Sequence, residues 1–312
     1  MRKASFQFRV SFVITAMMIL CGLATAQEDF SKVQIKTTKV AEGLYLLDAG
    51  ESGNVAALVG EDGVVMVDDM DAPLLGKLQD ALKSISDKPI RFVINTHYHG
   101  DHTGSNASFQ KQATVIAHDN VRVRLEKGGA SGNGGSMNFQ NDPGPKAALP
   151  ILTYDHELTV HLNGEDVRVV HFAAAHTDGD SIVYFPKANV VHLGDEFVTY
   201  GFPFIDVQSG GSIDGMIAAM EAVMRQMPAN IKVIPGHGPL CTLEDVRTYL
   251  QMMRGARGVV AKARKDGKTL EQMKQAKLLD AWKKYNGFVN EDTFLETLFY
   301  SPSLPESGLD AN

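Results

Sequence analysis

Apolar residues gather in short runs through the first half of the chain. Glycine-bearing turns separate these runs, which is typical of buried strands. The predicted strands are residues 44–47, 55–59, 64–67, 90–94 and 114–117. Residues 73–85 place apolar side chains at helical spacing instead, and shorter helices are predicted near 107–112 and 119–126. This half of the chain is therefore predicted to mix strands and helices.

The second half repeats the mixture. An Asn163-Gly164 dipeptide joins two alternating runs, 158–162 and 166–172, and this is a strong signal for a tight β-hairpin. The later predicted elements are strands 181–185, 190–193 and 232–234 and helix 213–227. Two strand-rich halves that also contain helices indicate an α/β (α+β) fold, but the pattern alone does not specify how the sheets are layered.

From residue 243 onward the pattern becomes helical. The predicted helices are 243–265, 270–285 and 291–300, with a break at residues 266–268 and Thr269 as a cap. Trp282 lies beside Leu278 and Leu279 on an amphipathic stretch, which predicts that the helix docks on the main domain. We expect a domain at 27–242 and a helical extension at 243–312 packed on it.

The N-terminus has the pattern of a secretory signal peptide. Arg2, Lys3 and Arg9 precede or flank an apolar run at 10–23, and small residues at 24–26 offer a cleavage site after Ala26. The apolar run is short for a membrane span. Residues 1–26 are therefore predicted to be removed, which would leave a periplasmic or secreted protein without stable membrane association.

The net charge limits which partners the protein can bind, and the cysteine count limits its disulfides. Cleavage after Ala26 would remove three of the 30 basic residues and none of the 37 acidic ones, leaving a formal charge of −10. Nucleic-acid binding calls for a basic face, so the acidic balance argues against such a partner and favours a small-molecule substrate. Only Cys241 would remain, which excludes an intramolecular disulfide in the mature chain.

The densest cluster of potential metal ligands lies directly after the apolar run 90–94. There the segment 95–102 reads Asn-Thr-His-Tyr-His-Gly-Asp-His and supplies four metal-binding side chains. Imidazole and carboxylate groups suit zinc and neighbouring transition metals. His176, Asp195 and His237 each follow a later apolar run, where a sheet edge meets a loop. A metal site explains this arrangement better than a solvated histidine-rich loop.

The ordered set His-x-His-x-Asp-His, then His, Asp and His, resembles the metallo-β-lactamase superfamily over about residues 40–240. The resemblance implies a four-layer αβ/βα sandwich and two Zn²⁺ ions, with Fe or Mn as alternatives. It places His97, His99 and His176 on one metal and Asp101, His102 and His237 on the other. Asp195 would bridge the two, and Asp101 would also orient the attacking hydroxide as the catalytic residue.

Other residues are expected to support these ligands, because metal-bound imidazoles usually donate their second N–H to a carboxylate or carbonyl. The candidates are Asp68, Thr96, Thr177 and Asp180. Asp69 and Asp71 are expected to be solvated. The remaining histidines are expected to be strand or loop residues: His118, His156, His161, His171 and His192.

Apolar residues near the ligands suggest where a substrate binds. Tyr200, Phe202 and Phe204 could line a pocket for an apolar acyl group or pack in the core. The glycine-rich segment 128–139 could be a flexible surface linker. It could instead form a flap whose Met137 and Phe139 contact the substrate.

Three functions remain open. The first is opening of a β-lactam by a metal-bound hydroxide, which the secretion signal favours, although residues 196–202, just after Asp195, contain no lysine to pair with the substrate carboxylate. The second is a lactonase, esterase or thioesterase, since glyoxalase II has a similar ligand set. The third is a periplasmic metal-binding module without turnover. The chain lacks a Gly-x-Ser-x-Gly elbow, which argues against a serine hydrolase.

Overall fold

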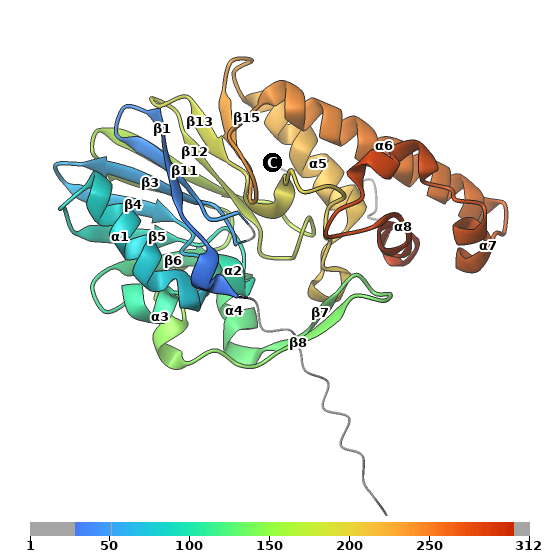
Figure 1. Ribbon diagram of the computed structural model, residues 1–312, viewed down its shortest axis with the longest axis horizontal. Helices are drawn as coiled ribbons and strands as arrows, with labels where there is room; N and C mark the ends of the chain where they lie inside the picture. The colour runs from blue at the N-terminus through green and yellow to red at the C-terminus, as the bar shows by residue number, and fades with distance from the viewer. Residues whose placement is uncertain (1–28, 51, 303–312) are drawn as a thin grey trace, which may run out of the picture. The chain divides into compact units, whose positions relative to one another are not determined.

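The strands form two large sheets that face each other (Figure 1). The computed structural model describes residues 29–50 and 52–302. Residues up to Lys32 separate as a small unit, whose described part contains only the 3-10 turn η1 (Phe30–Lys32). The signal peptide predicted at residues 1–26 lies outside the described residues and stays a prediction. Among the described helices, none combines the length and apolarity that crossing a bilayer requires.

The first sheet has the order β1-β2-β3-β4-β5-β6-β9. Its strands are β1 (Lys36–Ala41), β2 (Leu44–Asp48), β3 (Val55–Gly60), β4 (Gly63–Val67), β5 (Ile90–Ile94), β6 (Thr114–His118) and β9 (Leu152–Tyr154). Strands β1 to β4 pair antiparallel, and β4, β5, β6 and β9 pair parallel. The sequence pattern missed β1 and β9, which are edge strands with few buried side chains.

The second sheet has the order β10-β11-β12-β13-β14-β15. Its strands are β10 (Glu157–Leu162), β11 (Glu165–His171), β12 (Ser181–Phe185), β13 (Val190–His192), β14 (Lys232–Ile234) and β15 (Cys241–Thr242). The β10–β11 turn confirms the predicted hairpin. Asn163 and Gly164 have φ angles of 53° and 72°, as a two-residue type I′ turn requires.

Branched apolar side chains from both sheets meet in one core. Val65 and Val67 of β4 belong to the same buried cluster as Val167 and Val169 of β11. Each strand turns alternate residues toward the facing sheet, so the two inner faces are removed from water together. This burial holds the two halves of the chain against each other.

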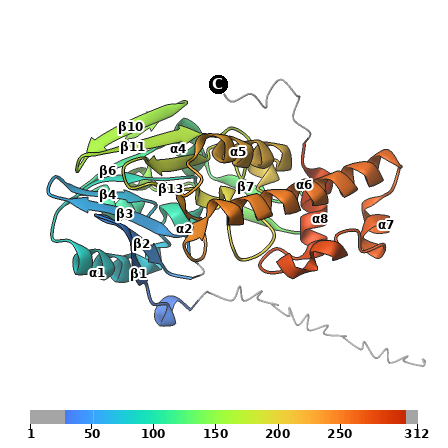
Figure 2. The ribbon, with the colours of Figure 1, turned by 90° about the horizontal axis from the view of Figure 1, so that it is seen from above.

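Helices cover the outer faces and complete four layers (Figures 1 and 2). On the first sheet, α1 (Leu75–Ile85) follows the turn η2 (Ala72–Leu74) and buries Leu78 and Leu82. On the second sheet lie α5 (Ile213–Gln226) and α6 (Leu243–Lys265). The short helices are α2 (Gly100–Thr103), α3 (Asn106–Phe109), α4 (Asp119–Lys127), η3 (Lys146–Ala148), η4 (Gly194–Glu196) and η5 (Val207–Ser209). The predicted αβ/βα sandwich is confirmed.

The C-terminal helices differ from the sequence pattern at one place. A single helix over 270–285 was predicted, but α7 (Leu270–Gln275) ends early and η6 (Asp280–Tyr285) follows as a separate 3-10 turn. Lys277 takes a left-handed φ of 47°, which an α-helix does not accommodate. Trp282 packs against α6, where a Cβ at Gly255 would lie 2.5 Å from the indole. Helix α8 (Glu291–Tyr300) then joins the cluster that α5 and α6 form on the second sheet.

The glycine-rich segment is a hairpin and not an unstructured linker. Strands β7 (Gly129–Gly132) and β8 (Asn138–Asn141) pair with each other. Two carboxylates hold it: Asp206 accepts the Gly132 N–H at 2.7 Å, and Glu296 accepts the Ser136 N–H at 2.7 Å. Both partners are distant in sequence, which is why composition alone suggested a flexible loop.

Candidate metal centre

The seven predicted ligands come from loops at the ends of four strands. The motif that starts at His97 follows β5, and helix α2 carries Asp101 and His102. The remaining three follow β11, β13 and β14: His176, Asp195 and His237. Two packed sheets therefore bring residues 140 positions apart to one edge, where loops are free to carry polar groups.

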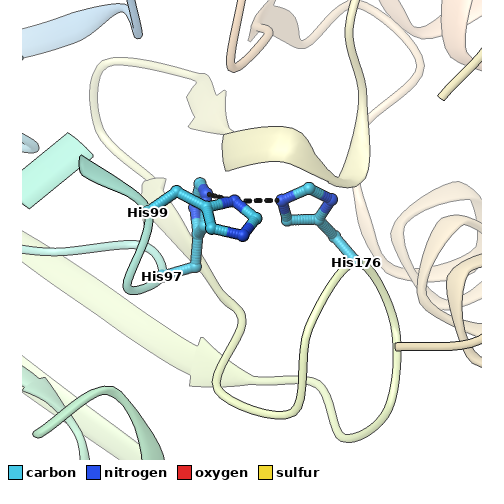
Figure 3. Close-up of side chains that lie close together, drawn as sticks. All are labelled: His97, His99 and His176. Atoms are coloured by element: carbon cyan, nitrogen blue, oxygen red, sulfur yellow. Dashed lines mark hydrogen bonds between the residues drawn. The ribbon is translucent and has the colours of Figure 1, made fainter. Parts of the chain in front are cut away.

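Three imidazoles converge at one end of the site (Figure 3). His99 Nδ1 lies 3.1 Å from His97 Nε2 and 3.0 Å from His176 Nε2. Ligand atoms of a tetrahedral ion with bonds of about 2.0–2.1 Å are separated by about 3.3 Å. The spacing of these nitrogens therefore fits one metal ion.

A second group lies beside the first. The Nε2 atoms of His102 and His237 lie 3.2 and 3.1 Å from Asp101 Oδ2. Asp195 reaches both groups, since its Oδ2 lies 3.8 Å from His176 Nε2 and 3.4 Å from His237 Nε2. Gly236 makes this approach feasible, because a Cβ at that position would lie 1.9 Å from Asp195 Oδ1.

Unsatisfied atoms support a cation at this place. His102 Nε2 and Asp195 Oδ1 are buried and lie 3.2 Å apart, yet neither has a hydrogen-bond partner among the described residues. Buried polar atoms without a partner are costly and call for an explanation. A cation held here would satisfy both atoms, so the histidine and aspartate side chains fit a metal-binding role.

Asp68, which follows β4, contacts the His102 ring directly and reaches the His97 ring through Thr96. Its Oδ2 lies 2.8 Å from His102 Nδ1 and accepts the Thr96 hydroxyl at 2.8 Å. That hydroxyl in turn lies 3.1 Å from His97 Nδ1. Asp68 is fully buried with a φ of 64°, a strained conformation for a residue with a side chain. This left-handed backbone conformation points the carboxylate toward the ligand rings.

The two other predicted supports act on the loop around His176. Asp180 accepts the Thr177 N–H at 2.6 Å and its hydroxyl at 2.5 Å, which closes the turn. His176 itself places Nδ1 2.8 Å from the carbonyl oxygen of Phe204. Thr177 and Asp180 therefore fix the backbone of the loop that carries His176.

Sequence reasoning missed Asp206, which orients His99. Its Oδ2 lies 3.1 Å from His99 Nε2 and accepts the Tyr98 hydroxyl at 2.6 Å and the Ser131 hydroxyl at 2.7 Å. Burial would raise the pKa of Asp206, but hydrogen bonding from His99 and Tyr98 lowers it below its ordinary value. No spacing pattern could identify this residue, because 107 positions separate it from His99.

The electrostatics of the site favour bound cations. Burial alone would raise the pKa of Asp101 and Asp195, but His102 and His237 hold both values well below the ordinary one. The same carboxylates overcome burial and raise the pKa of His237 to about 10. Ionised carboxylates among imidazoles suit a positive ion, which must displace protons when it binds.

Two expectations about polar residues outside the site need correction or refinement. Asp69 was expected to be solvated, but it is fully buried and accepts the Ser105 N–H at 2.9 Å, and burial raises its pKa. His118 and His171 were expected to be strand or loop residues, and their rings stack with centroids 3.5 Å apart. His192 is buried, and its Nε2 lies 3.3 Å from the carbonyl oxygen of Asn54.

The predicted substrate residues fall into two groups. The Tyr200 ring lies 5.4 Å from that of His237, and Phe139 is 48% exposed with its ring 6.0 Å from Phe204. Met137 packs against the hydrophobic cluster around α5 and α6. Phe202 is wrong as a substrate contact: it is fully buried and stacks on Phe294 at 4.6 Å.

Comparison with known proteins agrees with this geometry. The family model described as the metallo-β-lactamase superfamily matches residues 46–239, more than half of the chain. The chain belongs to the metallo-β-lactamase superfamily. A superfamily member has the αβ/βα sandwich found here, and most members are hydrolases or related enzymes.

Curated relatives match at low identity. One is the 2,4-dinitroanisole O-demethylase subunit alpha of Nocardioides sp., 27% identical over 46% of this chain. The match spans only 40% of that subunit's length. Another is a probable metallo-hydrolase of Methanocaldococcus jannaschii, 26% identical over 63% of this chain and 93% of its own length.

Solved structures show the same fold. A metallo-β-lactamase from Pontibacter korlensis matches with a TM-score of 0.60 and 16% identity, over 71% of this chain and 99% of that one. The sec-alkylsulfatase Pisa1 from Pseudomonas sp. matches with a TM-score of 0.61 and 15% identity, over 85% of this chain and 50% of that one. At these identities the likeness supports the fold and not the substrate.

Proposed function

We propose that this protein is a hydrolase that holds two divalent cations, zinc in the first instance, and opens a carbonyl bond of an apolar ester, lactone or thioester. The observation that carries the proposal is the convergence of two ligand groups on Asp195. Two bound cations would supply Lewis acidity toward the carbonyl oxygen and would acidify water at the site.

Asp101 and Asp195 are assigned different roles in this reaction. The Asp101 side chain is 28% exposed, whereas that of Asp195 is 7% exposed, so Asp101 is the carboxylate that an incoming substrate meets. We assign to Asp101 the orientation of the attacking water and the acceptance of its proton. The more buried Asp195 holds the two ligand groups together.

The surroundings favour an uncharged apolar substrate. Burial is the largest influence on the pKa values of Asp101, Asp195 and His237, and the charged groups that follow it are histidines and carboxylates. The aromatic rings of Phe204 and Tyr200 contact ligand rings instead. Two similar proteins are also named for alkyl or aryl substrates, an alkylsulfatase and a dinitroanisole demethylase.

Hydrolysis of β-lactams is the second candidate. The sandwich matches a metallo-β-lactamase over almost that enzyme's whole length, which favours it. Residues 196–202, which follow Asp195, contain no lysine to pair with the carboxylate of a β-lactam, and this ranks the candidate behind the ester-type bond.

The test measures metal content and turnover together. We expect two zinc ions per chain and a zinc-dependent kcat/KM above about 10⁴ M⁻¹s⁻¹ for an aryl-acyl ester or thioester, with a lower value for a chromogenic cephalosporin. Asp101→Asn should lower kcat by about 10²-fold or more. A higher value for the cephalosporin would establish the second candidate. Two bound zinc ions with no turnover of either class would indicate a metal-binding module and overturn the proposal.

A further inference from the structure

Four aromatic side chains from separate segments form a connected group, here called the aromatic collar: Phe139, Tyr200, Phe204 and Phe288. The ring centroids of Phe288 lie 5.7 Å from Tyr200 and 6.4 Å from Phe204, and Phe139 lies 6.0 Å from Phe204. Phe139 comes from the β7–β8 hairpin, and Phe288 lies between η6 and α8 in the C-terminal extension. The extension, coloured orange to red in Figure 2, therefore contributes to the collar.

The collar adjoins both groups of metal ligands. The Phe204 ring lies 5.9 Å from the rings of both His99 and His176, and the Tyr200 ring lies 5.4 Å from that of His237. A molecule whose reacting bond sits between the ligand groups would therefore have aromatic rings next to it. The collar is continuous with the candidate centre and is not a separate surface patch.

Two members of the collar are not core residues. Phe288 is 63% exposed and Phe139 is 48% exposed, whereas the neighbouring Phe202 is fully buried. Exposing a phenylalanine forgoes the free energy that its burial would give. Exposed aromatic rings grouped beside a polar centre mark a place where a ligand binds.

The backbone holds Phe288 in position. The Phe202 N–H donates to the Tyr285 carbonyl at 2.7 Å. A Cβ at Gly287 would lie 1.9 Å from the Tyr200 carbonyl oxygen, and one at Gly201 would lie 2.3 Å from that of Tyr285. These glycines let the two segments touch, so the extension presents Phe288 from a fixed backbone.

We propose that Phe288 is a specificity residue, which together with Phe139 clasps an aryl or comparable apolar group of the substrate beside the metal centre. The proposal rests on the proposed function for the position of the reacting bond. It assigns to the C-terminal extension a part in substrate selection as well as in packing. The occupant is an uncharged apolar group, since aromatic faces and edges provide contact without a counter-charge.

The experiment uses probes that do not depend on which bond is cut. Phenylmethanethiol and ethanethiol both offer a thiolate to zinc. Their dissociation constants for the zinc-loaded protein are measured by calorimetry. We expect the aryl thiol to bind about tenfold more tightly than the alkyl thiol, and Phe288→Ala and Phe139→Ala each to remove most of that preference. Affinity for ethanethiol should change less than about twofold. The matched control is Ile151→Ala, at an exposed apolar residue outside the collar, which should retain the preference.

Each other outcome has a distinct meaning. Equal weakening of both thiols by Phe288→Ala would indicate a structural role and overturn the proposal, as would an unchanged preference in both phenylalanine variants. A shift in oligomeric state with unchanged preference would assign the collar to an interface between copies and also overturn it. If Phe288→Ala does not fold, the preference of Phe139→Ala for the aryl thiol tests the proposal instead. Failure of the proposed function is recognised separately, because the protein would then bind no zinc or would turn over no ester in the assay above.

Discussion

At the scale of single residues, the site depends on what lies behind each ligand ring. His97, His102 and His176 meet a hydroxyl, a carboxylate and a backbone carbonyl through their Nδ1 atoms. His99 is reversed, because its Nε2 meets Asp206 and its Nδ1 faces the other two imidazoles. Such contacts fix both the tautomer and the direction of each ring, which sets affinity for the metal.

Asp206→Asn should weaken binding of the metal at His97, His99 and His176 by about 10- to 100-fold, because an amide is a poorer partner than a carboxylate for His99 Nε2–H. Competition against a chromogenic zinc chelator measures the effect, and the second ion should be retained. Asp214→Asn is the control, since Asp214 is a buried carboxylate paired with Arg257. Equal loss of metal in the two variants would show that Asp206 has no special role.

The stacked pair of His118 and His171 predicts a pH dependence of stability. Burial, and then the neighbouring His118, lowers the pKa of His171 to about 4, whereas an unfolded imidazole titrates near about 6.5. The folded chain therefore binds fewer protons between these values. The contribution of neutral His171 is fully present above about pH 6.5 and is lost as pH falls toward about 4.

His171→Phe should flatten the fall in unfolding free energy between pH 6.5 and 4 by on the order of 1 kcal/mol, after allowance for solvent screening of a partly exposed ring. Urea unfolding at several pH values, with chelator present throughout, measures the slope. The exposed His156 supplies the control, and His156→Gln should keep the wild-type slope. An unchanged slope in His171→Phe would contradict the assignment.

At the scale of elements, the aromatic residues after η4 have two roles: one packs in the core, and two lie beside the ligand rings. Phe202 stacks on Phe294 of α8 and thereby ties the loop to the extension. Tyr200 and Phe204, two positions to either side, contact ligand rings instead. An extended strand would turn residues two positions apart to the same side, but the chain bends over 199–202 and Gly201 takes a φ of 135°. This bend lets one short run serve both the core and the site.

Phe202→Ala should lower the unfolding free energy by about 3–5 kcal/mol, because it opens a cavity between the loop and α8. Chemical denaturation measures the loss. Phe288→Ala removes the same side chain from an exposed position and should cost less than about 1 kcal/mol. A small loss for Phe202→Ala together with a raised KM would restore Phe202 as a substrate contact.

At the scale of the whole molecule, the candidate metal centre draws its residues from both halves of the sandwich. His97, Asp101 and their neighbours come from the first sheet, and His176, Asp195 and His237 come from the second. Each ligand group contains residues of both halves, so neither half holds a complete site. The interface between the sheets thus positions the chemistry as well as burying the core.

The sequence alone determined the features that depend on neighbouring residues. Strand β5, strand β12 and helices α6 and α8 begin and end where the apolar pattern placed them, and the Asn163-Gly164 turn follows from local φ preferences. The seven proposed ligands were recognisable because His, Asp and Gly follow the strands at a characteristic spacing. Imidazole and carboxylate at such spacing indicate a metal whatever the rest of the chain does.

Only the tertiary structure decided what depends on residues far apart in the sequence. Asp206 meets His99 across 107 positions, and Phe288 reaches the collar from the extension. The glycine-rich hairpin takes its form from Asp206 and Glu296 and not from its own composition. Phe202 and Phe204 look alike in sequence, but burial separates them. Such contacts arise only when packing of the apolar faces has fixed the distances, and no local pattern encodes them.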